Sequence, residues 1–143
     1  MSLFSPTRRA EVKARAGERC EYCHLPTRGQ VATFPIDHII PKSTSSDHDP
    51  ENLALACPPC NAFKWTAVEW RDPVSGRIAP LFHPRRDNWN AHFNWLAGYV
   101  LSGVTPSGRA TVAALRMNNP EMIELRRLLA GLDLFPELDN LRA

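Results

Sequence analysis

The sequence lacks any apolar run of about 18 residues, the length that a membrane-spanning helix needs. Its first residues contain no apolar segment typical of a signal peptide, so we expect a cytoplasmic protein. It has no internal repeat and no low-complexity tract, and hydrophobic residues make up 43% and charged residues 22% of the chain, as in globular proteins. These features exclude membrane-spanning, repetitive and disordered classes. With 143 residues, we expect one domain over 1–143.

The chain also lacks a strong net charge, which is only +2. The charges are unevenly placed. Residues 31–60 carry four acids and one lysine, whereas residues 1–30 and 61–109 each carry six basic residues and three acids. This pattern suits a cation site flanked by surfaces that bind phosphate.

Cysteine is scarce, and all four cysteines fall into two C-x-x-C pairs, Cys20 with Cys23 and Cys57 with Cys60. Two such pairs supply the four thiolates of a tetrahedral zinc site. The alternatives are two disulfides or a redox motif, but cytosolic thiols stay reduced. We therefore expect a structural zinc ion, because four protein ligands leave no open position for water.

Capping residues and turn residues divide the first half of the chain. Ser5 and Pro6 predict the start of a basic helix that extends to Ala16 and stops at Gly17. Short strands are expected at 34–40 and 52–56, with a polar loop at 42–51 between them. A helix is expected from about 61 to 69. The order is therefore strand, loop, strand and helix.

The second half is less regular. Prolines and a glycine at 71–88 predict turns and loops, and apolar residues at 92–104 predict a strand or hairpin bent near Gly98. Thr105 and Asn119 should cap helices that end near Met117 and Gly131. The last helix should present one apolar face, formed by Met122, Leu125, Leu128 and Leu129. The expected fold class is α+β.

A polar motif lies between the cysteine pairs and beside them. It consists of Asp37-His38-Ile39-Ile40-Pro41, then Asn52-Leu53, then Cys57-x-x-Cys60-Asn61-x-x-Lys64. Over residues of about 20–65 the sequence resembles the HNH endonucleases. The resemblance implies a ββα-metal finger core at about 18–70, clasped by the four-cysteine zinc site. An N-terminal helix precedes it, and a hairpin and helices form a C-terminal extension at 71–143.

The resemblance also implies roles for four residues. His38 would be the general base, Asp37 and Asn61 would hold a catalytic divalent cation, and Asn52 would bond to backbone and orient the loop that carries His38. Adjacent residues on a strand point to opposite faces, so Asp37 and His38 can share a site only if the strand ends or twists there. Because the family often has histidine where this chain has Asn61, we expect Mg²⁺ or Mn²⁺ rather than Ni²⁺ or Zn²⁺.

The same residues allow plainer interpretations. His38 could pack in a half-buried strand, Asp37 could cap a turn, and Asn52 and Asn61 could each be a helix or turn cap. His24 could be a spare zinc ligand, although four cysteines already fill that site. His48 could be a substitute ligand, but a histidine exposed in its loop is the simpler interpretation.

The chain departs from the family pattern at two places. Ser45-Ser46 and Trp65 stand where the family often has glycine. We expect these changes to affect loop flexibility, packing and the fit of the substrate.

The predicted function is metal-dependent hydrolysis of phosphodiester bonds in DNA, with Lys64, Arg85 and Arg86 as candidate phosphate contacts. The alternatives are a zinc-stapled nucleic-acid-binding module without catalysis, a zinc-folded protein-interaction domain and a nuclease directed at RNA. No base-reading module is visible, so sequence-specific cutting is not expected. The sequence leaves the oligomeric state open.

Overall fold

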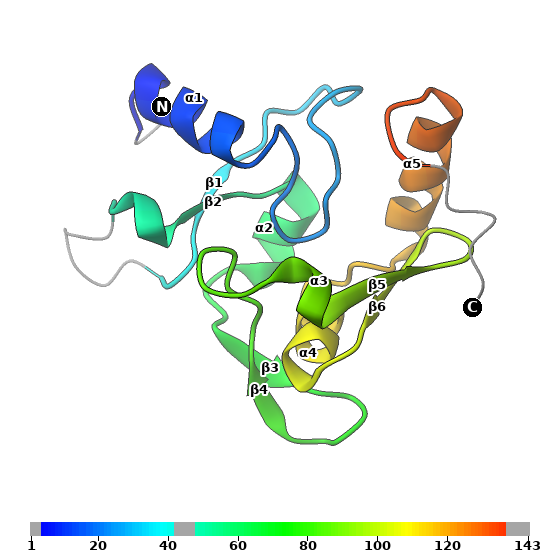
Figure 1. Cartoon of the computed structure of the whole chain (residues 1–143). Helices are drawn as coiled ribbons and strands as arrows, with labels where there is room; N and C mark the ends of the chain where they lie inside the picture. Colours follow the sequence, from blue (N-terminus) through cyan, green and yellow to red (C-terminus); the bar gives the residue numbers. More distant parts are fainter. Residues whose placement is uncertain (1–3, 42–47, 137–143) are drawn as a thin grey trace.

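The computed structural model describes residues 4–41 and 48–136, which form helices and three separate two-stranded antiparallel sheets, with the β3–β4 pair at the lower edge of the view (Figure 1). The α+β class is therefore confirmed. Residues 42–47 form most of the loop expected at 42–51 and lie outside the described residues. They include Ser45 and Ser46, which stand where the family often has glycine. None of the helices in the described part of the chain is long and apolar enough to cross a membrane.

Helix α1 (Pro6–Arg15) begins and ends where its capping residues predict. The Ser5 hydroxyl accepts a hydrogen bond from the backbone N–H of Arg8 at 3.1 Å, and Gly17 follows the helix with φ of +69°. The guanidinium of Arg15 donates to the carbonyls of Pro50 at 2.9 Å and Leu53 at 2.6 Å. The basic helix is thereby anchored to the short helix η1 (Pro50–Asn52) and to the strand that follows it.

The expected strand–strand–helix unit is present, with shorter elements. Strand β1 (Ile36–His38) pairs with β2 (Leu53–Leu55) in antiparallel register, and helix α2 (Pro58–Lys64) follows. The helix expected at 61–69 is wrong at both ends. It starts earlier because the Cys57 thiol caps it, accepting from the backbone N–H of Cys60 at 3.5 Å. It stops at Lys64 because Trp65 has a positive φ of 47°.

The C-terminal half contains one hairpin that the sequence did not predict. Strand β3 (Glu69–Arg71) begins at the expected end of the helix predicted for 61–69, and β4 (Ile78–Pro80), its partner, lies where only turns and loops were expected. Of these residues only Ala79 is buried, so no alternating apolar pattern marks the strands. The expected hairpin bent near Gly98 is confirmed as β5 (Phe93–Leu96) and β6 (Val100–Gly103), and helix α3 (Trp89–His92) precedes it.

The two predicted C-terminal helices are confirmed as α4 (Pro106–Ala114) and α5 (Pro120–Gly131). The expected apolar face of α5 is only partly correct. Met122 and Leu129 are buried, but Leu128 is 58% exposed, and Arg126 is fully buried instead. The extension also packs on the first cysteine pair, since the Trp89 indole N–H donates to the carbonyl of Tyr22 at 2.9 Å.

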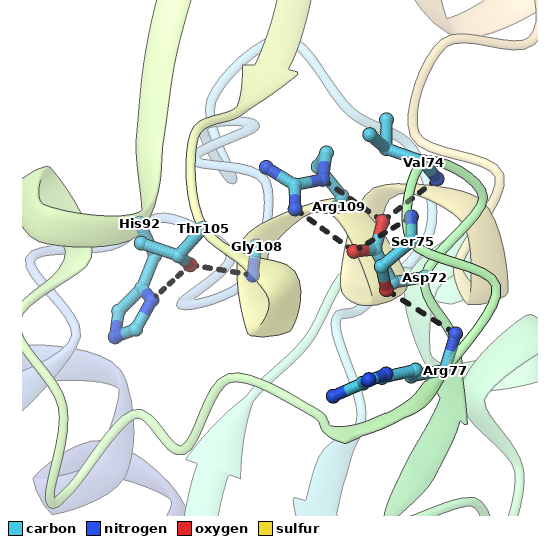
Figure 2. A network of polar contacts seen from close by, with 8 residues as sticks. All are labelled: Asp72, Val74, Ser75, Arg77, His92, Thr105, Gly108 and Arg109. Carbon is cyan, nitrogen blue, oxygen red and sulfur yellow. Dashed lines mark hydrogen bonds and ion pairs between the residues drawn. The ribbon is translucent and has the colours of Figure 1, made fainter.

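A buried ion pair joins the β3–β4 hairpin to α4 (Figure 2). The guanidinium of Arg109 donates to both carboxylate oxygens of Asp72, each at 2.8 Å. The same carboxylate accepts from the backbone N–H of Val74 at 3.0 Å and so holds the hairpin turn. These hydrogen bonds, of which that to Arg109 is the strongest, lower the pKa of Asp72. Arg109 thus ties α4 to the hairpin.

We expect Asp72→Asn to lower the thermal unfolding temperature by several degrees at pH 7. Arg109 then loses a buried negative charge that accepts two of its hydrogen bonds. A folded-state pKa below the unfolded value of about 3.9 means that this stability is present above that pH and is lost as the pH falls further. The difference between wild type and variant should therefore stay constant from pH 8 to pH 5. Circular dichroism melts would measure it, with Glu69→Gln on the same hairpin as control. If the difference in unfolding temperature already disappears at pH 6, the lowered pKa of Asp72 is contradicted.

Candidate functional site

The four cysteines form one buried cluster, as their spacing predicts. Their ligand atoms all lie within 4.8 Å of one another, and none forms a disulfide. The sulfur atoms of Cys23 and Cys57 are 3.7 Å apart. Sulfurs at tetrahedral corners about 2.3 Å from a zinc ion would be about 3.8 Å apart, whereas a disulfide bond is about 2.0 Å long. The cluster therefore fits a metal ion such as zinc, and the disulfide alternative is wrong.

The four thiols of this cluster also influence one another's ionisation. Hydrogen bonds with the other thiols lower the pKa of Cys23, and similar contacts raise the pKa values of Cys57 and Cys60. Without a metal ion, the four thiols therefore do not all ionise together. A bound cation stabilises all four thiolates, which is the usual chemistry of a site with four cysteine ligands.

Arg126 lies beside the cysteine cluster and was missed by sequence reasoning, because it carries no motif and lies on a helix face expected to be apolar. Its guanidinium donates to the carbonyl of Tyr99 at 2.8 Å and to that of Met117. Burial lowers the pKa of Arg126, and the nearby thiols, Cys23 foremost, act in the opposite direction. Four thiolates and one Zn²⁺ carry two excess negative charges, and Arg126 offsets one of them.

The first cysteine pair also positions Tyr22, which lies between Cys20 and Cys23. The Tyr22 hydroxyl donates to the Oδ2 atom of Asp37 at 2.7 Å. Burial, assisted by the Asp37 carboxylate, raises the pKa of Tyr22 well above its usual value, so Tyr22 stays protonated and remains a donor. No sequence signal marked this tyrosine, because its partner lies in another element.

Asp37 also forms a buried ion pair with Lys64, whose Nζ atom is 3.0 Å from Oδ2. The same ammonium donates to the carbonyls of Ile39 at 3.1 Å and His38 at 3.3 Å. Burial raises the pKa of Asp37, while Lys64 and the Tyr22 hydrogen bond act against that rise. Only 2% of the Lys64 side chain is exposed, so its ammonium is engaged with Asp37 and the two carbonyls, and its contact with a phosphate stays a prediction.

A cleft of about 280 Å³ brings together three of the predicted site residues, Asp37, His38 and Asn61. Asp37 and His38 come from β1, which ends at His38, so two neighbouring side chains reach one cleft. Asn61 comes from the interior of α2, and the cap of that helix is Cys57, so Asn61 is not a helix cap. The cleft is completed by Ile36, Pro41, Trp65 and Thr66.

His48 contacts His38 instead of standing exposed in its loop. The Nε2 atom of His38 and the Nδ1 atom of His48 are 3.1 Å apart, and the ring of Phe4 lies 5.1 Å from that of His48. His24, in contrast, lies outside the cysteine cluster and stacks on Trp89 at 3.8 Å. Burial lowers the pKa of His24 to about 4, so its ring is neutral at pH 7.

Asn52 makes the kind of backbone contact that the resemblance implies. Its amide oxygen accepts from the N–H of Ile40 at 2.9 Å, and its amide nitrogen donates to the Ile40 carbonyl at 2.9 Å. In addition, the Ile39 N–H donates to the Asn52 carbonyl at 2.9 Å. These bonds fix the backbone directly after His38.

The two arginines predicted to contact phosphate differ from each other. Arg85 forms an ion pair with Glu21, and only 11% of its side chain is exposed. Glu21 in turn accepts from the backbone N–H of Leu55 at 2.8 Å. Arg85 therefore fixes the loop against the first cysteine pair, and its contact with phosphate stays a prediction. Arg86 is exposed.

Comparison with known families identifies the segment that holds both the cysteine cluster and the cleft. Residues 20–64 match the family model of the HNH endonucleases. The resemblance seen in the sequence is thus confirmed over just under a third of the chain. A search of curated proteins and a search of solved structures found no match. This HNH segment and its metal-binding cysteine cluster indicate a nuclease-type function.

We expect Arg126→Met to weaken zinc retention by about 10- to 100-fold, the range typical of residues that support metal ligands. The variant removes the positive charge beside the thiolates. Transfer of zinc to a coloured chelator would measure the effect, with Arg126→Lys as a variant that keeps the charge and folds more readily. Arg127→Met is the matched control, since Arg127 is partly exposed and pairs with Glu124. Equal zinc release by the Arg126 and Arg127 variants would refute the charge argument.

Proposed function

We propose that this protein is a metal-dependent HNH endonuclease that hydrolyses phosphodiester bonds in DNA. The observation that carries this proposal is the convergence of Asp37, His38 and Asn61 on one cleft. Structural contacts account for the cysteines, for Lys64, for Arg85 and for the Oδ2 atom of Asp37. The nearness of His38 and Asn61 to Asp37 in one cleft is what a nuclease site would require.

Asp37 and Asn61 would hold the catalytic cation. Tyr22 and Lys64 both contact the Oδ2 atom of Asp37, so within the described part of the chain Oδ1 is the oxygen left for a cation. Asn61 would contribute its amide oxygen. Mg²⁺ and Mn²⁺ accept such oxygen ligands and keep several waters, so two protein oxygens suffice. When bound, the cation would neutralise charge on the scissile phosphate and stabilise the leaving oxygen.

His38 would act as the general base. The Nε2 atom of His38 faces Nδ1 of His48, and in the tautomer with a proton on Nε2 the atom of His38 that accepts a proton would be Nδ1. That atom would take a proton from water while the water oxygen bonds to phosphorus and the bond from phosphorus to the 3′-oxygen breaks. The departing 3′-oxygen would take its proton from solvent water. The products are a 5′-phosphate and a 3′-hydroxyl. Asn52, through Ile40, would hold the backbone that presents His38.

The C-terminal extension would act with the HNH segment as one domain. Arg85 pairs with Glu21 and Trp89 donates to the Tyr22 carbonyl, both between the first two cysteines, and the charge of Arg126 is felt by the cysteine thiols. Among the candidate phosphate contacts, Arg86 is the one whose side chain is exposed. A phosphate contact of this kind contributes affinity without sequence preference, which suits non-specific cutting.

We expect His38→Ala to slow cleavage of supercoiled plasmid by about 10²- to 10⁴-fold, the usual contribution of a general base. The assay compares Mg²⁺, Mn²⁺ and EDTA lanes, and zinc content confirms that the variant is folded. His24→Ala serves as control because His24 lies outside the cleft. DNA binding without cleavage in any lane by the wild type would favour the binding-module alternative, and cleavage of RNA alone would reassign the substrate.

We expect Asn61→Ala to raise the Mg²⁺ concentration that gives half-maximal cleavage by about tenfold, because one of two protein oxygen ligands is lost. Asn61→Asp should lower that concentration, since a carboxylate is a stronger ligand than an amide. His38→Ala should change the maximal rate without shifting this midpoint. Metal titrations of the cleavage rate would separate the two effects. An unchanged midpoint in Asn61→Ala would remove Asn61 from the cation site.

A further inference from the structure

Trp65 is an exposed aromatic residue at the edge of the candidate active site. Its side chain lines the same cleft as Asp37, His38 and Asn61, yet 79% of the residue is exposed to solvent. The sequence suggested that a tryptophan at this position would affect packing. The structure shows instead that the indole ring does not enter the core, so packing does not explain its presence.

The backbone at Trp65 adopts a conformation that suits glycine. Its φ of 47° and ψ of −111° are close to those of the first central residue of a type II′ turn. The Ala67 N–H donates to the Lys64 carbonyl at 2.8 Å, which closes a turn over residues 64–67. Glycine is favoured at this turn position because it lacks a Cβ atom. A large side chain there is strained, and strained positions of this kind concentrate at functional sites.

We propose that Trp65 stacks on an unpaired nucleobase next to the phosphate that is cut. This inference rests on the proposed nuclease function and names its substrate class. The substrate would be DNA that exposes a base face near the cleavage point, as in single strands and gaps, in preference to continuous duplex.

Geometry and chemistry both support this assignment. The groups proposed to act on the phosphate lie in the cleft that Trp65 borders, and a nucleotide that places its phosphate there holds its base only a few bonds away. An exposed indole ring offers a flat apolar face, and every base can stack on such a face, which fits the lack of a base-reading module. In a continuous duplex the base faces are already covered by their neighbours, so stacking would require a base to be unstacked first.

The test is a binding titration in a His38→Ala background, so that the DNA stays intact. The probe is an oligodeoxynucleotide that contains 2-aminopurine, whose fluorescence falls when the base stacks, either single-stranded or fully paired. The variants are Trp65→Ala, Trp65→Phe and Trp65→Gly. The matched control is Trp70→Ala, because Trp70 is also exposed, at 46%, and does not line the cleft.

We expect Trp65→Ala and Trp65→Gly to bind the single strand about tenfold more weakly or worse, with loss of the fluorescence quenching. Trp65→Phe should keep part of both signals, and Trp70→Ala should bind like the parent. Duplex affinity should change little in every variant. Trp65→Gly should melt no lower than the parent because glycine fits the turn, so its loss of affinity cannot come from unfolding.

Two results would overturn the inference while leaving the nuclease proposal intact. One is unchanged single-strand affinity in Trp65→Ala, and the other is an equal loss in Trp70→Ala. If the parent binds neither DNA form, both the inference and the proposed function fail together.

Discussion

The four buried thiol groups are the constraint on which the rest of the structure depends. They join two short segments that lie at either end of the HNH segment, and each segment delivers a site residue. The first carries Tyr22, which donates to Asp37, and the second begins α2, which carries Asn61. The Cys57 thiol caps that helix. Arg126 of α5 is close enough for its charge to interact with these thiols. A metal ion that stabilises the cluster therefore also stabilises the cleft.

The buried contact between Asp37 and Lys64 transmits this constraint to the candidate active site. A charged pair removed from water is tolerated only when its remaining hydrogen-bonding groups are satisfied. Here the three ammonium protons of Lys64 face three acceptors, which are Asp37 and the carbonyls of His38 and Ile39. Lys64 therefore holds the end of β1 as well as the carboxylate, so His38 and Asp37 are fixed by one interaction. Asn52 fixes the next residue, Ile40.

Local signals in the sequence predicted those elements whose ends are set by nearby residues. Ser5, Thr105 and Asn119 each cap a helix because the side-chain oxygen needs only a backbone N–H three residues away, and a proline follows each of them. The β3–β4 hairpin could not be found in this way. Nearly all of its strand residues are exposed, so its sequence has no alternation of apolar and polar residues that would indicate a strand. The Asp72–Arg109 pair that fixes this hairpin joins residues far apart in the chain (Figure 2).

The sequence alone determined the cysteine pairs, the order of the strand–strand–helix unit and the identity of Asp37, His38 and Asn61, because the types and spacing of these residues are visible along the chain. Only the tertiary structure decided where charges are buried and which side chains stay open. Lys64 and Arg85 look like surface cations, but each pairs with a distant carboxylate, so Lys64 is buried and Arg85 is largely covered. Trp65 was expected to affect packing, but the turn that ends α2 leaves it exposed beside the cleft. Burial depends on partners brought together by folding, and composition and spacing do not record those partners.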